Sequence, residues 1–197
     1  FLSLYPAAPY VGLADGLHAR AGVSARQAQA DDACRPNQLL AITLGVVQDQ
    51  ALRGYILQAC QKLLLPGGIR SLADQRVNYP LPVYHQGQLL NDPLAPYWGE
   101  YSGDEDTRRK PAYHNGTAWG WMMPSYSEAL FMTYGASARA TAQALLNAAG
   151  INITRGCLGH LPEIFSGDSP HLPRGCCAQA WSESELFRVL TLVSDKK

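Results

Sequence analysis

The sequence predicts an all-α fold made of helical hairpins that are separated by long, aromatic-rich loops. Segments with helical periodicity occur in adjacent pairs joined by very short turns, which favours antiparallel hairpins. Between the pairs, closely spaced prolines and glycines interrupt every periodic run, so these segments are expected to be loops. A chain of 197 residues with 47% hydrophobic content is long enough for one core and too short to expect two. We therefore expect residues 1–197 to form a single domain.

The first hairpin is predicted within the first third of the chain, after an irregular lead-in over residues 1–34. Its first helix begins near Pro36, which is tolerated in a first helical turn, and continues to about Val47. Its second helix has Asp49 as the expected N-cap and ends at Pro66-Gly67-Gly68. The apolar stripe of this second helix is the clearest in the chain and consists of Leu52, Tyr55, Ile56, Ala59, Cys60, Leu63 and Leu64.

Three further helices are predicted in the second half of the chain. Residues 119–134 form one, with Pro124 near its start and a glycine at its end, and residues 137–149 form its antiparallel partner. The last helix covers residues 178–193. Residues 137–149 are rich in alanine and are followed by Gly150, and the last helix has Leu186, Val189, Leu190 and Val193 as its apolar stripe.

Residues 69–115 and 151–177 are expected to be long loops. The first contains a mixed charge run, Asp104–Lys110, that we expect to be an exposed loop tip. It also contains many tyrosines and tryptophans, which argues against disorder. Structureless loops of this length inside a compact domain are usually functional or mobile.

Charge and cysteine content restrict the possible partners and compartment. Sixteen basic and sixteen acidic residues cancel, so no net charge directs the chain to nucleic acid or to anionic lipid, and a neutral ligand is expected. No apolar run approaches the length of a membrane span. The five cysteines are odd in number and lack C-x-x-C spacing, which favours reduced thiols in a cytoplasmic protein.

The segment before the last helix brings together residue types that are typical of a sugar site. Glu163 follows a proline in a predicted loop, and Gln179 and Trp181 follow at the joint between this loop and the helix. The alternatives are a solvated loop glutamate and a tryptophan that anchors the core. A metal site is not expected, because ligands spaced three residues apart converge only on a helix, and prolines exclude a helix here. The residues considered for it are His160, Glu163, Asp168 and His171.

Five stretches, taken in order, resemble one family. They are Arg35-Pro36-Asn37-Gln38-Leu39-Leu40-Ala41, Gly68-Ile69-Arg70-Ser71-Leu72, Tyr113-His114-Asn115-Gly116-Thr117-Ala118-Trp119-Gly120-Trp121, Leu161-Pro162-Glu163 and Cys177-Ala178-Gln179-Ala180-Trp181-Ser182. Their order and spacing resemble the C-terminal part of the amylo-α-1,6-glucosidase module of glycogen debranching enzymes, of archaeal and bacterial type. The resemblance extends from about Ala33 to Val193.

This resemblance implies an (α/α)6 toroid, in which helical hairpins surround a funnel and loops at one rim hold the sugar. The helices predicted here would form about half of such a ring. The family consists of inverting glycosidases, which need one carboxyl group as general acid and one as general base. The base belongs to the Leu-Pro-Glu motif, which is Glu163 here, and no cofactor or metal is implied. The acid belongs to an upstream Gly-Arg-Asp-Thr type motif that this sequence lacks.

The resemblance also implies a set of sugar-binding candidates. They are Tyr113, His114, Asn115, Trp119, Trp121, Gln179, Trp181, Arg70, Asn37 and Gln38. The alternatives are a helix-cap role for His114, a structural salt bridge for Arg70, and hydrogen bonds at a helix start for Asn37 and Gln38. Trp119 and Trp121 are two residues apart on a predicted helix, so they are not expected to share one face. We expect one of them to stack on a sugar and the other to pack in the core.

The implied activity is hydrolysis, with inversion, of α-1,6-linked glucose stubs on an α-glucan such as glycogen or a branched maltooligosaccharide. The acid would come from the N-terminal remainder of the same enzyme, so the isolated chain is expected to be close to inactive. A truncated ring would leave an apolar edge, which favours self-association. Two alternatives remain open. One is a non-catalytic glucan-binding module, and the other is a glucoamylase- or trehalase-like toroid that acts on a different sugar.

Overall fold

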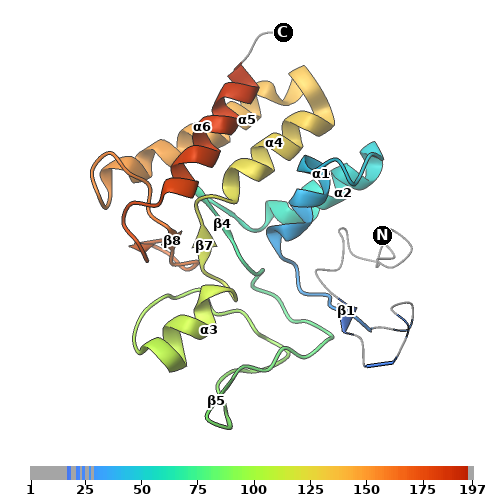
Figure 1. Cartoon of the computed structure of the whole chain (residues 1–197), viewed down its shortest axis with the longest axis vertical. Coiled ribbons are helices and arrows are strands. Elements are labelled where there is room, and N and C mark those ends of the chain that lie inside the picture. Colours follow the sequence, from blue (N-terminus) through green and yellow to red (C-terminus); the bar gives the residue numbers. More distant parts are fainter. Residues whose placement is uncertain (1–16, 19–20, 23, 25–26, 28, 195–197) are drawn as a thin grey trace.

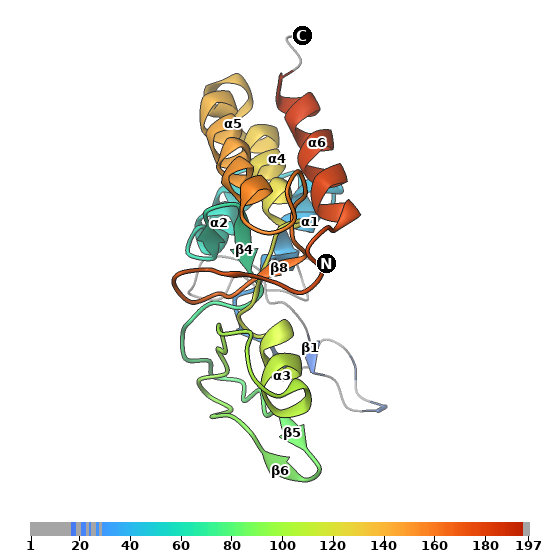
Figure 2. The same cartoon turned by 90° about the vertical axis from the view of Figure 1, so that its left-hand side faces the viewer.

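The computed structural model describes residues 17–18, 21–22, 24, 27 and 29–194. One end of the molecule is helical (Figure 1) and contains α1 (Leu40–Thr43), α2 (Gln50–Gln61), α4 (Met123–Tyr134), α5 (Arg139–Ala148) and α6 (Ala180–Ser194). The opposite end contains α3 (Lys110–Tyr113) and the hairpin of β5 (Tyr84–His85) and β6 (Gln88–Leu89). The view turned by 90° shows the same separation of the two ends (Figure 2).

An antiparallel sheet of very short strands joins the two ends. It consists of β3 (Leu64–Leu65), β4 (Gly68–Arg70), β7 (Ala118–Trp119), β8 (Ile164–Phe165) and β9 (Pro173–Arg174), in the order β3-β4-β7-β8-β9. Its register pairs Ile69 with Trp119 and Trp119 with Ile164. The sheet therefore brings together three segments that are far apart in the sequence.

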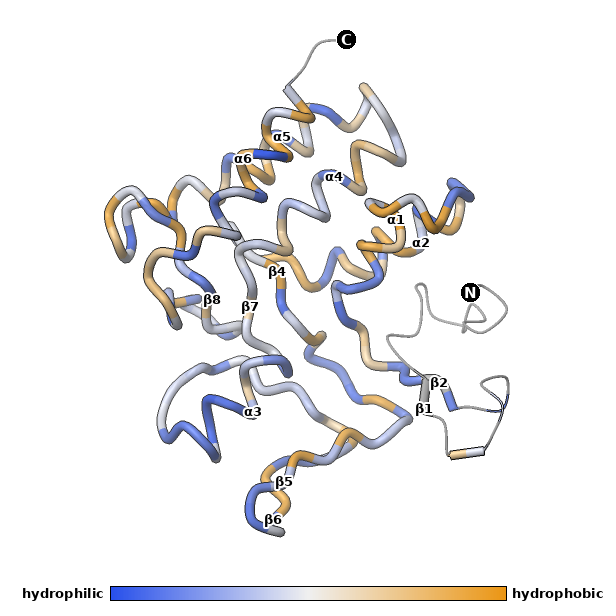
Figure 3. The backbone as a smooth tube through the Cα atoms, in the orientation of Figure 1, coloured by the Kyte–Doolittle hydropathy of each residue, from blue (hydrophilic) through white to orange (hydrophobic). Residues whose placement is uncertain are grey.

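Helix α4 is the centre of the helical end, because it packs against α1, α2, α5 and α6. Most of its first two turns is buried, including polar residues such as Ser127 and Glu128. Apolar segments recur along these helices, whereas the segment around α3 is hydrophilic (Figure 3). The main core therefore lies among the helices.

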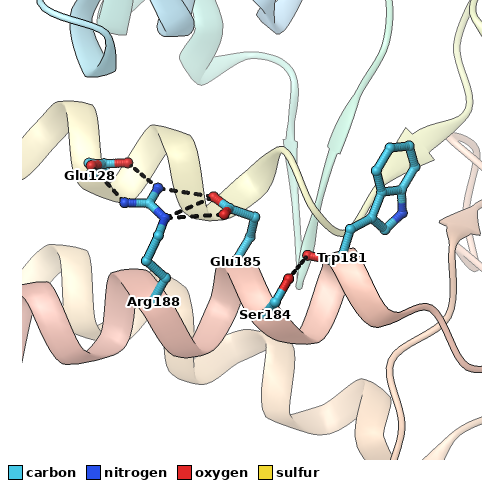
Figure 4. A network of polar contacts seen from close by, with 5 residues as sticks. All are labelled: Glu128, Trp181, Ser184, Glu185 and Arg188. Carbon is cyan, nitrogen blue, oxygen red and sulfur yellow. Dashed lines mark hydrogen bonds and ion pairs between the residues drawn. The ribbon is translucent and has the colours of Figure 1, made fainter.

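A bidentate ion pair fixes α6 against α4. Arg188 on α6 donates to the two carboxylate oxygens of Glu128 on α4, at 3.0 and 2.5 Å, and also binds Glu185 at 2.9 Å (Figure 4). Because paired N–H donors fix the angle as well as the distance, this contact restrains the orientation of α6. Trp181 lies near the start of the same helix, so its position depends on this orientation.

The first predicted hairpin is partly confirmed. Asp49 caps α2 as predicted, with its Oδ1 accepting from the backbone N–H of Leu52 at 2.7 Å. The preceding helix is shorter than predicted, because a 3-10 turn, η2 (Pro36–Leu39), leads into α1 and the chain then turns at Gly45 with φ of +74°. Two members of the predicted stripe were assigned wrongly. Leu64 belongs to strand β3 and not to the helix, and Tyr55 is 51% exposed instead of packing in the core.

The prediction of an all-α fold missed the sheet. Each strand is only two or three residues long, too short to show the alternation by which a strand is recognised in a sequence. Residues 69–115, predicted to be a loop, contain most of β4, the β5–β6 hairpin and α3. Residues 151–177 contain β8, β9 and the end of a 3-10 segment, η5 (Ala149–Thr154).

The charge run is helical and not a loop tip. Asp104 Oδ1 accepts from the backbone N–H groups of Asp106 and Thr107, at 3.0 and 2.9 Å, and so caps a π-helical turn, η3 (Glu105–Arg109). Lys110 forms ion pairs with Glu105 and Asp106 and continues the chain into α3. Lys110 and Asp106, which are four residues apart, therefore face each other on one helical surface.

The third predicted helix begins four residues later than expected. Trp119 lies on β7, where its backbone pairs with β4 and β8, and α4 begins at Met123 with Pro124 in its first turn. The last helix begins at Ala180, close to its predicted start.

The expected irregular lead-in lies mostly outside the described residues. Within the described part, β1 (Leu17–His18) pairs antiparallel with β2 (Gln29–Ala30), so this part is a short ribbon. In the region that the structure covers, no helix is long and apolar enough to cross a membrane.

Candidate active site

The sheet determines where Glu163 lies. Glu163 directly precedes β8, and its backbone N–H donates to the Cys176 carbonyl at 2.8 Å. Its own carbonyl accepts from the N–H of Gly120, just after β7, at 3.5 Å. Pro162 is also held, because its carbonyl accepts from the hydroxyl of Ser182 on α6 at 3.3 Å. The Leu-Pro-Glu segment is therefore fixed between β7 and the start of the last helix.

Both oxygens of the Glu163 carboxylate accept a hydrogen bond. The Tyr113 hydroxyl donates to Oε1, and the backbone N–H of Cys176 donates to Oε2 at 2.9 Å. Burial, and then the neighbouring carboxylate, raise the pKa of Tyr113 well above its usual value, so this hydroxyl stays protonated. An ionised carboxylate offers about four lone-pair sites, so acceptor sites remain for a water molecule.

A cavity of about 400 Å³ opens next to this arrangement. Aromatic rings make up four of its nine lining residues, which are Arg35, Pro36, Asn37, Ser71, His114, Trp119, Trp121, Met122 and Trp181. Among the predicted sugar-binding residues, His114, the three tryptophans and Asn37 thus share one cavity. Aromatic faces with a few polar groups are the usual lining of a small-molecule site.

Trp181 contacts both of the other tryptophans of the cavity. Trp121 stacks on Trp181 with ring centroids 5.1 Å apart and an angle of 26°, and Trp119 meets Trp181 edge to face at 6.0 Å. Trp119 is buried, whereas Trp181 is 44% exposed. Both Trp119 and Trp121 line the cavity, and Trp119 also packs in the main core, as expected for one of the two rings. The premise that both lie on one helix was wrong, because Trp119 is on a strand.

Arg35 lines the cavity and was not among the predicted site residues. Its guanidinium donates to the carbonyls of Ser71 and His114 and, at 3.0 Å, to Oδ1 of Asn115. Burial, and then this nearby positive charge, lower the pKa of His114, which keeps the imidazole neutral at pH 7. The only sequence signal for Arg35 was its place at the start of the Arg-Pro-Asn-Gln motif.

Several predicted site residues do not line the cavity. Gln38 is buried and donates to the Arg35 carbonyl at 2.9 Å, which agrees with the alternative of a helix-start hydrogen bond. Arg70 donates to the Gly167 carbonyl at 3.0 Å and lies over the Tyr97 ring at 5.9 Å. Gln179 donates through its backbone N–H to the Leu161 carbonyl at 2.9 Å.

The Tyr113 ring lies between Glu163 and the aromatic cavity. Glu163, Tyr113 and Asn115 are not part of the cavity lining, although Tyr113 packs edge to face on Trp119 with centroids 4.7 Å apart. Asn115 donates to the Pro111 carbonyl at 2.8 Å. The carboxylate and the cavity are therefore neighbours that do not touch directly.

A second cavity, of about 320 Å³, is lined by residues that neighbour Glu163 in the sequence or in space. Its lining includes Pro162, Arg174, Gly175 and Cys177. Gly175 has φ of +66°, and a Cβ atom there would lie 2.4 Å from Oε2 of Glu163. A glycine is therefore required where the loop passes the carboxylate.

Comparison with known families identifies the chain. The family model for amylo-alpha-1,6-glucosidase matches residues 18–188, which is most of the sequence. The chain belongs to this family. The match supports a C-terminal module of glycogen debranching enzymes, and it covers all five motifs quoted above. No curated protein matches the sequence.

For this family member, the residues that were considered for a metal site are not brought together. His160 Nδ1 lies 2.8 Å from Glu183 Oε1, and His171 Nδ1 lies 3.2 Å from the Ser166 carbonyl oxygen. In the part of the chain that the structure describes, no group of three or more His, Cys, Asp or Glu side chains could hold a metal ion. All five cysteines are free thiols.

Proposed function

We propose that this chain carries the base half of an inverting α-1,6-glucosidase, with Glu163 as the general base. The observation that carries the proposal is the Glu163 carboxylate, held by two hydrogen-bond donors beside an aromatic cavity. In an inverting glycosidase the base takes a proton from water while that water attacks the anomeric carbon. The free acceptor sites on this carboxylate suit that role.

The aromatic cavity binds the glucose unit in this proposal. The exposed face of Trp181 packs against the apolar face of the sugar ring, while Arg35 and Asn37 reach its hydroxyl groups. A neutral α-glucan also agrees with the balanced charge of the chain. The substrate is then a branched α-glucan such as glycogen, from which a single α-1,6-linked glucose is removed.

The general acid lies outside this chain in the proposal and comes from the N-terminal remainder of the enzyme. It protonates the leaving oxygen from about 6.5–9.5 Å away from the base. The helices described here then form about half of an (α/α)6 toroid. Leu44, Val46, Tyr55 and Tyr134 are exposed on and beside α1, α2 and α4, and this surface receives the missing helices or a second copy of the chain.

The test uses a substrate whose leaving group needs no protonation. In α-D-glucosyl fluoride, fluoride departs without a general acid, so the base alone supports hydrolysis. We expect this chain to release β-D-glucose, the inverted product, as followed by proton NMR. Glu163→Gln should lower the rate about 100-fold or more, which is the typical contribution of a general base. Release from a phosphorylase limit dextrin should remain very low.

The matched control is Glu100→Gln, which changes an exposed glutamate whose carboxylate accepts from the hydroxyl of its neighbour Ser102 at 2.8 Å. This variant should retain the wild-type rate. Absence of fluoride hydrolysis in the wild-type chain, or an unchanged rate in Glu163→Gln, would contradict the assignment of the base.

A non-catalytic glucan-binding module is the second candidate, and it is favoured by the absence of Glu163 from the cavity lining. It predicts saccharide binding with the same affinity in Glu163→Gln and no fluoride hydrolysis. A toroid with another sugar preference would bind trehalose or maltose more tightly than isomaltose. Titration calorimetry with these three disaccharides separates the possibilities.

A further inference from the structure

We propose that Tyr113 is a positioning residue for Glu163 and that it does not contact the sugar. This inference rests on the proposed role of Glu163 as the base. It changes the role that the family resemblance implied for Tyr113, which was substrate binding. The Tyr113 hydroxyl donates directly to Oε1 of Glu163, although 50 residues separate them in the sequence.

Two donors from different parts of the chain hold the carboxylate. Tyr113 is the last residue of α3, whereas Cys176, which donates to Oε2, belongs to the loop before α6. With one donor on each oxygen, the carboxylate cannot rotate without losing a hydrogen bond. Hydrogen bonds to charged groups are stronger than those between neutral groups, so this orientation is well defined.

Three neighbouring rings pack against the half-buried Tyr113 and occupy part of its aromatic surface before a sugar could reach it. Its centroid lies 4.7 Å from that of Trp119, 4.8 Å from that of His114 and 5.9 Å from that of Tyr101. The Tyr113 carbonyl also accepts from the indole N–H of Trp119 at 3.2 Å. Packing and backbone contacts therefore hold this side chain in place before any substrate arrives.

A phenol suits this task because it donates a hydrogen bond without bringing a positive charge. An arginine or lysine in the same place would neutralise the carboxylate that must accept a proton from water. Burial and then the carboxylate itself raise the pKa of the Tyr113 hydroxyl above the usual tyrosine value of about 10, so the donor is available at neutral pH.

The first experiment is Tyr113→Phe, assayed on α-D-glucosyl fluoride with the full chain. This variant keeps the ring and removes only the hydroxyl. We expect kcat to fall about 10- to 100-fold, the usual effect of losing a hydrogen bond to a charged group, while KM changes less than about twofold. The matched control is Tyr101→Phe, whose hydroxyl makes no hydrogen bond to Glu163 among the described contacts. It should retain the wild-type kcat.

The second experiment detects the hydrogen bond between Tyr113 and Glu163 without an activity assay. The carboxyl carbon of Glu163, assigned through Glu163→Gln, should shift in the carbon NMR spectrum of Tyr113→Phe and not in that of Tyr101→Phe. Thermal unfolding of each variant confirms that it is folded.

The outcomes are distinguishable. An unchanged kcat in Tyr113→Phe would overturn the positioning role. A raised KM at constant kcat would also overturn it, because this result indicates that Tyr113 contacts the sugar. If the wild-type chain hydrolyses no fluoride, the proposed function fails, and the NMR comparison still tests by itself whether Tyr113 holds the Glu163 carboxylate. A shifted Glu163 resonance then supports the contact, and an unshifted one overturns it.

Discussion

Substitution of Gly175 by alanine tests the packing of the loop against Glu163. The added Cβ would lie 2.4 Å from Oε2 of Glu163 and 2.9 Å from Cγ1 of Ile164. Ile164 is fully buried on β8, so the glutamate side chain is the partner that must move. Its movement breaks the hydrogen bond with the N–H of Cys176.

The expected cost has two parts. A non-glycine residue with φ near +66° costs about 1–2 kcal/mol, because its Cβ approaches the following carbonyl oxygen. Overpacking of a filled site adds about 1–3 kcal/mol. Gly175→Ala should therefore lower the free energy of unfolding by about 2–5 kcal/mol. The control is Gly159→Ala, which has φ of +83° and nothing within 4 Å of the added Cβ, so only the first part applies.

Urea unfolding followed by circular dichroism measures both variants. The difference between them isolates the clash and should be about 1–3 kcal/mol, with Gly175→Ala the less stable. In the fluoride assay, Gly175→Ala should lose about tenfold or more in kcat, because the base is displaced. Equal stabilities, together with a retained rate, would show that Gly175 does not pack on the Glu163 carboxylate.

Three further predictions concern the helices and the cavity. Arg188→Met should lower the free energy of unfolding by about 2–3 kcal/mol in urea titrations, because it leaves the buried carboxylate of Glu128 without its bidentate partner; a loss below about 0.5 kcal/mol would refute this. The pKa of His114 is lowered by burial and then by Arg35, so the folded protein binds fewer protons than the unfolded chain near pH 6. Stability should therefore rise with pH and decline as the pH falls through the unfolded value of about 6.5, and His114→Gln should flatten this slope in unfolding titrations between about pH 5 and 7. An unchanged slope in His114→Gln would contradict the lowered pKa of His114. Trp181→Ala should weaken isomaltose binding about 5- to 10-fold in calorimetry, whereas Phe187→Ala, which removes an exposed ring from the same helix, should leave it unchanged; equal effects of the two substitutions would exclude a specific role for Trp181.

Local patterns in the sequence determined the longer helices and the identity of the main candidate residue. The helical character of α2 and its Asp49 cap depend on residues within one or two turns, so a sequence pattern is enough to predict them. The same holds for α6. Glu163 was identified through its motif, because the order of the motifs along the chain does not depend on the secondary structure between them.

Only the tertiary structure decided how the site is assembled. The strands are two or three residues long and are stabilised by partners far away in the sequence, so no local periodicity marks them. The sheet places Trp119 on a strand beside Glu163, which brings both Trp119 and Trp121 to the cavity. The contacts of Tyr113 with Glu163 and of Arg35 with Asn115 span 50 and 80 residues, respectively. Residue types and motif spacing identify such side chains as candidates. The packing of the whole chain determines which of these side chains contact one another.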